Sequence, residues 1–448
     1  MDANRGQWNS KIGFIMAAAG SAIGLGNIWR FPYVAGENGG AAFVFIYVIF
    51  VFLIGLPYMF GELSLGRATQ KNPVGAIQQI LPGSLWKIGG YLGVLIGIGI
   101  LSFYAVIAGW TVLYIYKMMI GDPGGFGEVI ADPSIVLPLF AFFIFLTGFV
   151  VYKGVSEGIE KWSKILMPIF FLMLLGTIVF ALTLDGAMKG LEFYLKPDFS
   201  KLHGGIILAA LGQAFFSLSL GMGTMITYGS YLNKQDNIMT SGISVAIFDT
   251  LIAIMAGMII FPALFAMGED PSSGPLLVFV VLPKLFAQMP GGLIVGTIFF
   301  ILLAVAALTS TISLLEVPVA YVIDEFKVSR PKVVWIVSII AFVLGIPSAL
   351  SQGASELFSN FEIFPAKLAS GADFLSQMSF LFGDIGLASG AVILSLFIGW
   401  KWGVERAAKE IENGAPHFSK IKVIWGVLIR FVIPAVIFIV LLQTIRVF

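Results

Sequence analysis

Two short stretches, GSAIGLGN at residues 20–27 and SLSLGMGT at residues 217–224, decide the fold predicted for this chain. Each lies in the middle of a long apolar segment and combines glycine with serine or asparagine. A glycine costs a helix interior about 1 kcal/mol relative to alanine, so each cluster predicts a local interruption of a helix. Interrupted backbone at membrane depth must be buried in protein or line a wet cavity. The alternative is that the small residues only permit close helix packing.

Composition places both stretches in a polytopic membrane protein. The 448 residues are 58% hydrophobic and only 11% charged, whereas soluble domains carry about 25% charged residues. The net charge of +1 gives no electrostatic case for nucleic acid. Cysteine is absent and histidine occurs twice, which argues against disulfides and a histidine-rich metal site. No cleavable signal peptide is expected, because the first apolar run contains Asn27 and Arg30.

Eleven apolar segments are long enough to span a bilayer, which requires about 20 residues per helix. They lie near 12–34, 41–66, 88–116, 134–152, 163–184, 205–232, 240–266, 292–323, 332–350, 374–400 and 423–445. Runs of this length and uniform apolarity predict an all-α membrane protein. Lysine and arginine gather in the loops that are cytoplasmic if the N-terminus is inside. The odd number of spans then predicts an external C-terminus.

The two interrupted segments are the first and sixth spans, which predicts an inverted 5+5 repeat. We expect one transmembrane domain over 1–448, with a first repeat at 12–184, a second at 205–400 and an additional span at 423–445. Paired interruptions are typical of a transporter site. Broken helices free carbonyl oxygens for a hard cation and expose helix N-termini that attract a carboxylate.

The sequence around these breaks resembles the neurotransmitter:sodium symporter family. The resemblance is carried by GSAIGLGNIWRFPYVAGENGG (20–40), QAFFSLSLGMG (213–223), ALTSTISLLE (307–316) and DEF (324–326), and it is collinear over essentially the whole chain. The family usually has twelve spans, one more than predicted here. The resemblance implies a sodium-coupled secondary active symporter that imports an amino acid across the cell membrane by alternating access. It leaves the oligomeric state open.

The resemblance also implies two sodium sites. The first would use Ala22, Asn27, Ser217 and Asp249, and the second Gly20, Ile23, Ala306, Thr309 and Ser310. Most relatives have asparagine at the position of Asp249. An ionised Asp249 paired with sodium is favoured here, and the alternative is a protonated, hydrogen-bonded acid. The number of sodium ions, one or two, stays open.

Chloride is not expected as a partner. Animal relatives hold chloride with a tyrosine, a glutamine and two hydroxyl groups, and Tyr47, Gln213 and Ser217 match three of these positions. The fourth position is Ala253, and Asp249 lies one turn before it. We expect the carboxylate of Asp249 to supply the negative charge instead.

The substrate is expected between the two breaks. The residues that the resemblance assigns to it are Ala22, Leu25, Gly26, Ile100, Tyr104, Phe216, Ser217, Ser219, Met222, Ser310 and Leu314. Monoamine carriers have an aspartate at the position of Gly24, so glycine there favours an α-amino acid. Met222 replaces a phenylalanine of relatives and is flexible enough to accommodate large side chains. We expect a branched or aromatic hydrophobic L-amino acid, and leave leucine-like and tryptophan-like substrates open.

Gates are expected on both sides of the substrate. Outside, Arg30 should pair with an acid on the tenth span, for which Asp373 is preferred over Asp384. Inside, the resemblance pairs Arg5 with Asp324 and places Trp8 and Tyr231 nearby. Gly158 and Pro168 would let the fifth span unwind during sodium release. The alternatives are a snorkelling Arg30, an Arg5 that only sets topology and an ordinary proline kink.

Other classes of protein fit the sequence less well. A channel or amino-acid sensor should show a pore-lining repeat or filter, and none is visible. A membrane enzyme needs a nucleophile with a base, but neither Ser217 nor Ser310 has a histidine within its span.

Overall fold

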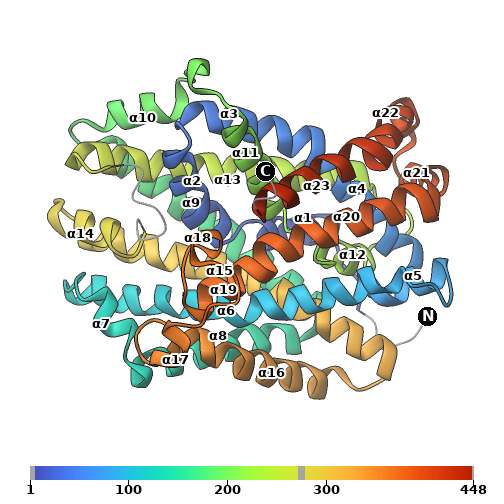
Figure 1. The fold of residues 1–448 in the computed structure, drawn as a ribbon, viewed down its shortest axis with the longest axis horizontal. Helices are drawn as coiled ribbons and strands as arrows, with labels where there is room; N and C mark the ends of the chain where they lie inside the picture. Colours follow the sequence, from blue (N-terminus) through green and yellow to red (C-terminus); the bar gives the residue numbers. More distant parts are fainter. Residues whose placement is uncertain (1–5, 271–277, 446–448) are drawn as a thin grey trace.

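The computed structural model describes residues 6–270 and 278–445, and every regular element within them is helical. The long helices lie side by side along one axis of the molecule (Figure 1). The longest are α6 (Lys87–Ile120), α8 (Pro133–Tyr152), α9 (Lys161–Leu182), α13 (Ile238–Met267), α15 (Gly292–Phe326) and α16 (Arg330–Leu350). This confirms the predicted all-α class.

Several spans change helical geometry along their length. One span consists of α3 (Ala41–Phe50), η2 (Val51–Gly55) and α4 (Leu56–Thr69), and in another η3 (Val155–Glu160) precedes α9. A third consists of α19 (Phe374–Met378), η6 (Ser379–Gly386), α20 (Leu387–Leu396), η7 (Phe397–Gly403) and α21 (Val404–Glu412). The fourth consists of α22 (Lys422–Val427), η9 (Leu428–Val432) and α23 (Ile433–Thr444). All the η segments in this group are π-helical. Such segments are frequent at functional sites.

Short helices connect the spans. They are α5 (Pro73–Ile80), α7 (Phe126–Ile130), α10 (Ala187–Leu195), η4 (Phe199–Lys201), α14 (Val281–Gln288), α17 (Glu356–Ser359), α18 (Ala366–Ala369) and η8 (Pro416–Lys420).

The first span is broken where the glycine cluster predicts. Helix α1 (Lys11–Ala22) starts at Ser10, whose side chain accepts a hydrogen bond from the Gly13 amide, and ends before Ile23, which is extended. The chain resumes as η1 (Gly26–Arg30) and α2 (Phe31–Glu37), bent by 49° relative to α1. The N–H groups of Gly24 and Leu25 are therefore released from the helix and donate to side chains, to Asn27 Oδ1 at 3.2 Å and to the Tyr104 hydroxyl at 2.7 Å.

The sixth segment is broken as well. Helix α11 (Gly204–Ser217) and helix α12 (Thr224–Gly229) are separated by residues 218–223. Within that link Ser219, Gly221 and Gly223 have φ values of 53°, 85° and 77°. Left-handed backbone is unfavourable for most side chains, so Gly221 and Gly223 account for two of these three positions, and Ser219 adopts the conformation without being glycine.

The number of spans is only partly confirmed. Nine helices among the described residues are long and apolar enough to cross a membrane, and the bent pair α1 with η1–α2 makes ten. The predicted eleventh is the segment 205–232, where α11 has 14 residues and qualifies only as a shorter apolar helix. The repeat boundaries stay a prediction.

The two breaks meet against the scaffold of α6 and α15. Helix α15 packs along α6 and also contacts α1, α9 and α12. Close approach is possible because α6 presents Gly93 toward Met222 and Gly97 toward Leu314. The site described below lies in this junction.

Candidate functional site

A small cavity of about 30 Å³ lies between the two broken segments. Nine of the residues predicted to touch substrate line it: Ala22, Gly26, Ile100, Tyr104, Phe216, Ser219, Met222, Ser310 and Leu314. The other two predicted residues lie just outside. The backbone N–H of Leu25 donates to the Tyr104 hydroxyl at 2.7 Å, and Ser217 belongs to the carboxylate cluster described next.

The cavity is also lined by four residues that the sequence analysis did not assign to substrate: Ser21, Gly24, Ser313 and Leu387. The hydroxyls of Ser21 and Ser313 are 2.7 Å apart, which joins the first break to α15. A sequence signal existed for both, because Ser21 belongs to the glycine cluster and Ser313 follows Ser310 by one helical turn. Leu387, on the distant tenth span, gave none.

Asp249 is fully buried, and the hydrogen-bond donors that it receives from the described part of the chain are all uncharged. The Asn27 amide nitrogen lies 2.8 Å from Oδ1, the Ser217 hydroxyl 2.8 Å from Oδ2, and the Tyr47 hydroxyl 3.2 Å from Oδ2. A buried carboxylate without a compensating charge is strongly unfavourable. The cluster can therefore hold a cation or a proton at this point, and it unites all three predicted side chains of the first sodium site.

The second predicted sodium site is brought together where α15 faces the end of α1. The Thr309 hydroxyl lies 2.9 Å from the Ala306 carbonyl oxygen and 3.5 Å from that of Ile23. The Ser310 hydroxyl is 3.5 Å from the same Ile23 oxygen. A Cβ on Gly20 would lie 3.2 Å from Thr309 Cβ, so this glycine is adjacent. These oxygens are neutral, which suits a monovalent hard cation better than a divalent one.

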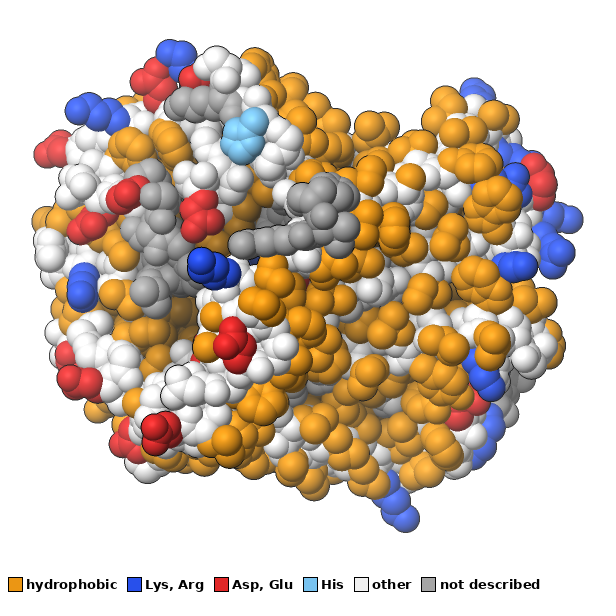
Figure 2. Space-filling model, viewed as in Figure 1, with side chains coloured by type: hydrophobic (Ala, Val, Ile, Leu, Met, Phe, Trp, Pro, Cys, Tyr) orange, Lys and Arg blue, Asp and Glu red, His pale blue; other side chains and the backbone are white. Residues whose placement is uncertain are grey.

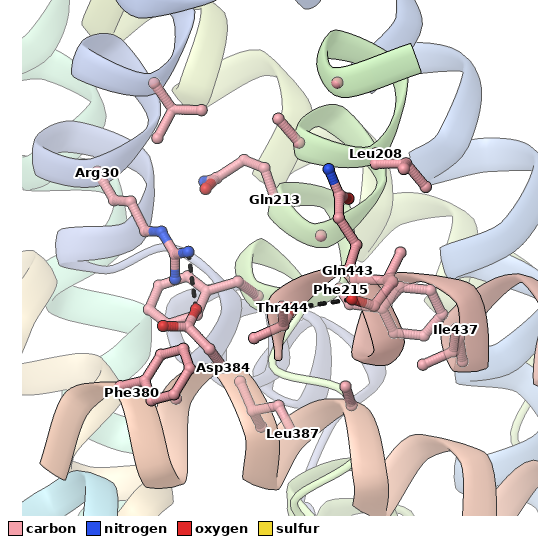
Figure 3. Close-up of a pocket in the computed structure, with 18 of the residues that line it drawn as sticks. Arg30, Leu208, Gln213, Phe215, Phe380, Asp384, Leu387, Ile437, Gln443 and Thr444 are labelled. Carbon is pink, nitrogen blue, oxygen red and sulfur yellow. Dashed lines mark hydrogen bonds and ion pairs between the residues drawn. The ribbon is translucent and has the colours of Figure 1, made fainter. Parts of the chain in front are cut away.

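On one side of the cavity, Arg30 and Phe216 form a lid. The Arg30 guanidinium lies 4.4 Å from the centre of the Phe216 ring and pairs with Asp384 at 2.9 Å. Figure 3 shows this ion pair among the residues that line a vestibule of about 340 Å³, to which α11, α20 and α23 also contribute. Phe216 and Leu387 line both the vestibule and the cavity, so the two spaces are neighbours at these residues.

The preference for Asp373 as the partner of Arg30 is wrong. Asp373 is the N-cap of α19 and accepts from the Ser376 amide at 3.1 Å and from the Gln352 side chain at 2.8 Å. These hydrogen bonds fix it at a helix start. Asp384, the other acid considered, lies in η6 and faces Arg30.

The opposite side of the cavity is closed by the N-terminal segment. Trp8 is only 4% exposed, and its indole nitrogen donates to the Tyr228 carbonyl oxygen at 3.0 Å. The Trp8 amide donates to the carbonyl oxygen of Tyr231, the predicted gate residue. Asp324 accepts from the Asn72 amide at 2.9 Å. Arg5 lies outside the described residues, so its pairing with Asp324 stays a prediction.

The predicted hinge coincides with a change in helical geometry. Gly158 lies in η3, and Pro168 lies within the following α9. The neighbouring Glu160, which the sequence analysis did not single out, is 1% exposed and accepts from the Asn9 amide at 2.7 Å and the Ser10 hydroxyl at 2.8 Å. An acid three residues before the predicted span 163–184 gave no signal by itself, because its partners are about 150 residues away.

Comparison with known proteins agrees with this geometry. The model of the sodium:neurotransmitter symporter family matches residues 5–122 and 129–448. The uncharacterized sodium-dependent transporter YhdH of Bacillus subtilis is 41% identical over 98% of this chain and 97% of its own length. The mouse sodium- and chloride-dependent GABA transporter 2 is 26% identical over 94% of this chain and 77% of its length.

A solved structure is also similar over nearly the full length. The crystal structure of MhsT in complex with L-phenylalanine superimposes with a TM-score of 0.89 at 45% identity. It covers 98% of this chain and 100% of that chain.

Proposed function

The chain belongs to the sodium:neurotransmitter symporter family, a family of sodium-dependent transporters rather than enzymes, and we propose that it imports a hydrophobic L-amino acid together with sodium by alternating access. The observation that carries the proposal is the uncompensated Asp249 carboxylate beside the cavity in which two broken helices meet. A cation bound there would neutralise Asp249 and attract the carboxylate of an amino acid. Each ligand would then favour binding of the other, which couples the two fluxes.

The shape of the cavity supports an α-amino acid. A Cβ on Gly24 would lie 2.5 Å from the Tyr104 hydroxyl, so no side-chain acid can occupy this position. Because the protein offers no carboxylate at position 24, where monoamine carriers have an aspartate, we expect the substrate to carry its own. The Tyr104 hydroxyl and the freed amides after α1 are suitable donors to that carboxylate. The proposed substrate residues are the eleven named in the sequence analysis, together with Ser21, Ser313 and Leu387.

The walls favour a hydrophobic side chain. Ile100, Phe216, Met222 and Leu314 contribute apolar surface. MhsT, the similar solved structure, contains L-phenylalanine, which supports an aromatic substrate; a branched one is the second candidate. A cavity of about 30 Å³ is too small for either, so we expect Phe216 and Met222 to move when substrate enters.

Sodium use is supported by the family, and its sites are part of the proposal. Ala22, Asn27, Ser217 and Asp249 would hold the first ion, and Gly20, Ile23, Ala306, Thr309 and Ser310 a second. An elementary charge crossing the membrane contributes about 2.3 kcal/mol per 100 mV, so one or two ions can concentrate substrate many-fold. Chloride is not required in this proposal, because Asp249 supplies the negative charge and Ala253 offers no hydroxyl group.

The charge distribution supports a cytoplasmic N-terminus. Basic side chains gather at the end of the molecule that carries α5, α21 and α22, near the N-terminus, while acidic side chains are more frequent at the other end (Figure 2). Positive charge marks the cytoplasmic side of membrane proteins. We place the protein in the cell membrane with the Arg30–Asp384 vestibule outside, the gate residues Trp8, Tyr231, Asp324 and Arg5 inside, and the C-terminus outside.

Uptake into proteoliposomes tests this function. With sodium outside, saturable uptake of labelled phenylalanine, leucine or tryptophan is expected, and it should persist when gluconate replaces chloride. Equal uptake with choline in place of sodium would overturn the proposal. Non-saturable flux would indicate a channel, and binding without flux would indicate a sensor.

A further inference from the structure

A second cavity, of about 420 Å³, lies between the last two spans, far from the substrate site. One wall is η7 with the start of α21, and the other is α22 with η9. Four basic side chains line it: Lys401, Arg406, Lys422 and Arg430. Glu405 is the single acidic residue among the lining residues, and it pairs with Lys422. The lining therefore carries an excess of positive charge.

Arg430 is the unusual member of this group, because it lies eight residues inside the span Lys422–Thr444. Its Nε donates to the Gly399 carbonyl oxygen at 3.1 Å, and its guanidinium lies 5.0 Å from the centre of the Trp400 ring. Within residues 6–270 and 278–445 no acid pairs with it, and its terminal N–H groups have no acceptor. An unpaired charge inside a span is costly and marks a functional site by default.

The fold holds this arginine in place. The Trp400 indole donates to the Arg430 carbonyl oxygen at 2.9 Å, in addition to the contact between the Arg430 guanidinium and the Trp400 ring. A Cβ on Gly399 would lie 2.9 Å from Arg430 Cα, which explains why glycine is needed at this contact. The wall formed by α21 is anchored through Glu410, which pairs with the buried Arg67 at 2.8 Å. The cavity is thus built from both spans and is not a gap between loose chains.

The surroundings of the cavity are apolar and face outward. Trp400 and Phe431 are each 52% exposed, and Val423 and Val427 are also exposed. In a membrane these side chains contact hydrocarbon. The cavity therefore offers cationic donors with an apolar, outward-facing surface directly beside them, a combination that matches one amphipathic ligand.

We propose that this cavity binds an anionic phospholipid, with its phosphate on Arg430 and Lys401 and its acyl chains along Trp400 and Phe431. Basic pockets between spans on the cytoplasmic side are suited to such headgroups. A bound phosphate would supply the acceptors that the Arg430 guanidinium lacks. The site would join the tenth span to the eleventh, outside the substrate path.

Native mass spectrometry of the purified full chain with equal phosphatidylglycerol and phosphatidylcholine tests the proposal. Wild-type protein should retain phosphatidylglycerol preferentially. The double variant Lys401→Gln/Arg430→Gln should lose about tenfold or more of this affinity, since each basic residue contributes about 1 kcal/mol near an anionic surface. Lys409→Gln/Lys420→Gln removes the same charge from exposed positions outside the cavity at the same end and should retain the preference.

Three results would overturn the proposal. The first is equal retention of the two lipids by wild-type protein, a measurement that needs no variant. The second is an equal loss in the control double variant, which would indicate a diffuse charge effect. The third is displacement of phosphatidylglycerol by inorganic phosphate at matched concentration, which would show that the site takes a free anion. Arg430→Lys retains the charge and should keep most of the preference.

Discussion

At the scale of single residues, the buried acid Asp249 determines what the site can bind. Its three donors are neutral, so the carboxylate is stable only with a cation or a proton. A lone ionisable residue in an apolar run was visible in the sequence. Its partners, contributed by the first, second and sixth spans, became visible only in the folded chain.

We predict that Asp249→Asn weakens sodium binding while preserving most of the local hydrogen bonds. Removing one charge about 4 Å from a cation costs several kcal/mol at an effective dielectric of about 20, so the apparent sodium affinity should fall by at least tenfold. Sodium-dependent binding of labelled substrate measures this. Asp185→Asn, which changes an exposed loop carboxylate, is the control. Unchanged sodium affinity in Asp249→Asn would show that the acid is protonated.

The two candidate gate acids, Asp384 and Asp373, make different contacts, so substituting each should have a different effect. Asp384→Asn should speed release of bound substrate up to a few-fold, since partly exposed ion pairs contribute only about 0–1 kcal/mol. Asp373→Asn should leave release unchanged and only weaken the start of α19, since asparagine is also a good N-cap. Dissociation of labelled substrate measures both. The same effect from Asp373→Asn would reverse the assignment.

The error over these two acids has a physical origin at the next scale, that of the helical elements. Both acids lie near the start of the tenth span, and which of them faces Arg30 depends on where the helix begins and how it winds: Asp373 caps α19, whereas Asp384 lies in the π-helical η6. No sequence pattern marks a π-helical segment. The breaks after α1 and α11 were predictable because their cause is local, namely clustered glycine.

The link between α11 and α12 provides a direct test of that local cause. Gly221 has a φ of 85°, and a Cβ there would lie 2.5 Å from the Leu387 carbonyl oxygen. Gly221→Ala should therefore destabilise the protein by about 1–2 kcal/mol or more and reduce substrate binding. Thermal unfolding and binding measure the two effects. Gly176→Ala, where a Cβ on α9 meets nothing within 4 Å, should be neutral or stabilising. Equal stability of the two variants would contradict this account of the break.

At the scale of the whole molecule, transport requires the two closures to open in turn. Arg30, Phe216 and Asp384 make contacts on one side of the cavity, and the Trp8 segment makes contacts on the other. The contacts of Glu160 connect this second closure to the fifth span. Because the same acid holds the N-terminal segment and lies in η3, release of the segment and unwinding at Gly158 should occur together.

We predict that Glu160→Gln loosens the inner closure. The amide weakens the hydrogen bonds from Asn9 and Ser10 and removes the ion pair with Lys164. The chain contains no cysteine, so Thr227→Cys introduces a single thiol at a buried position, one residue before Tyr228, whose carbonyl oxygen accepts from the Trp8 indole. Labelling of this thiol by a maleimide should become several-fold faster in Glu160→Gln. Glu157→Gln is the matched control, since Glu157 lies in the same segment and, among residues 6–270 and 278–445, its ion pair is with the exposed Lys161 at 3.9 Å. If both variants label at the wild-type rate, Glu160 does not hold the closure, and the coupling of hinge and gate must come from α1 packing on α9 alone.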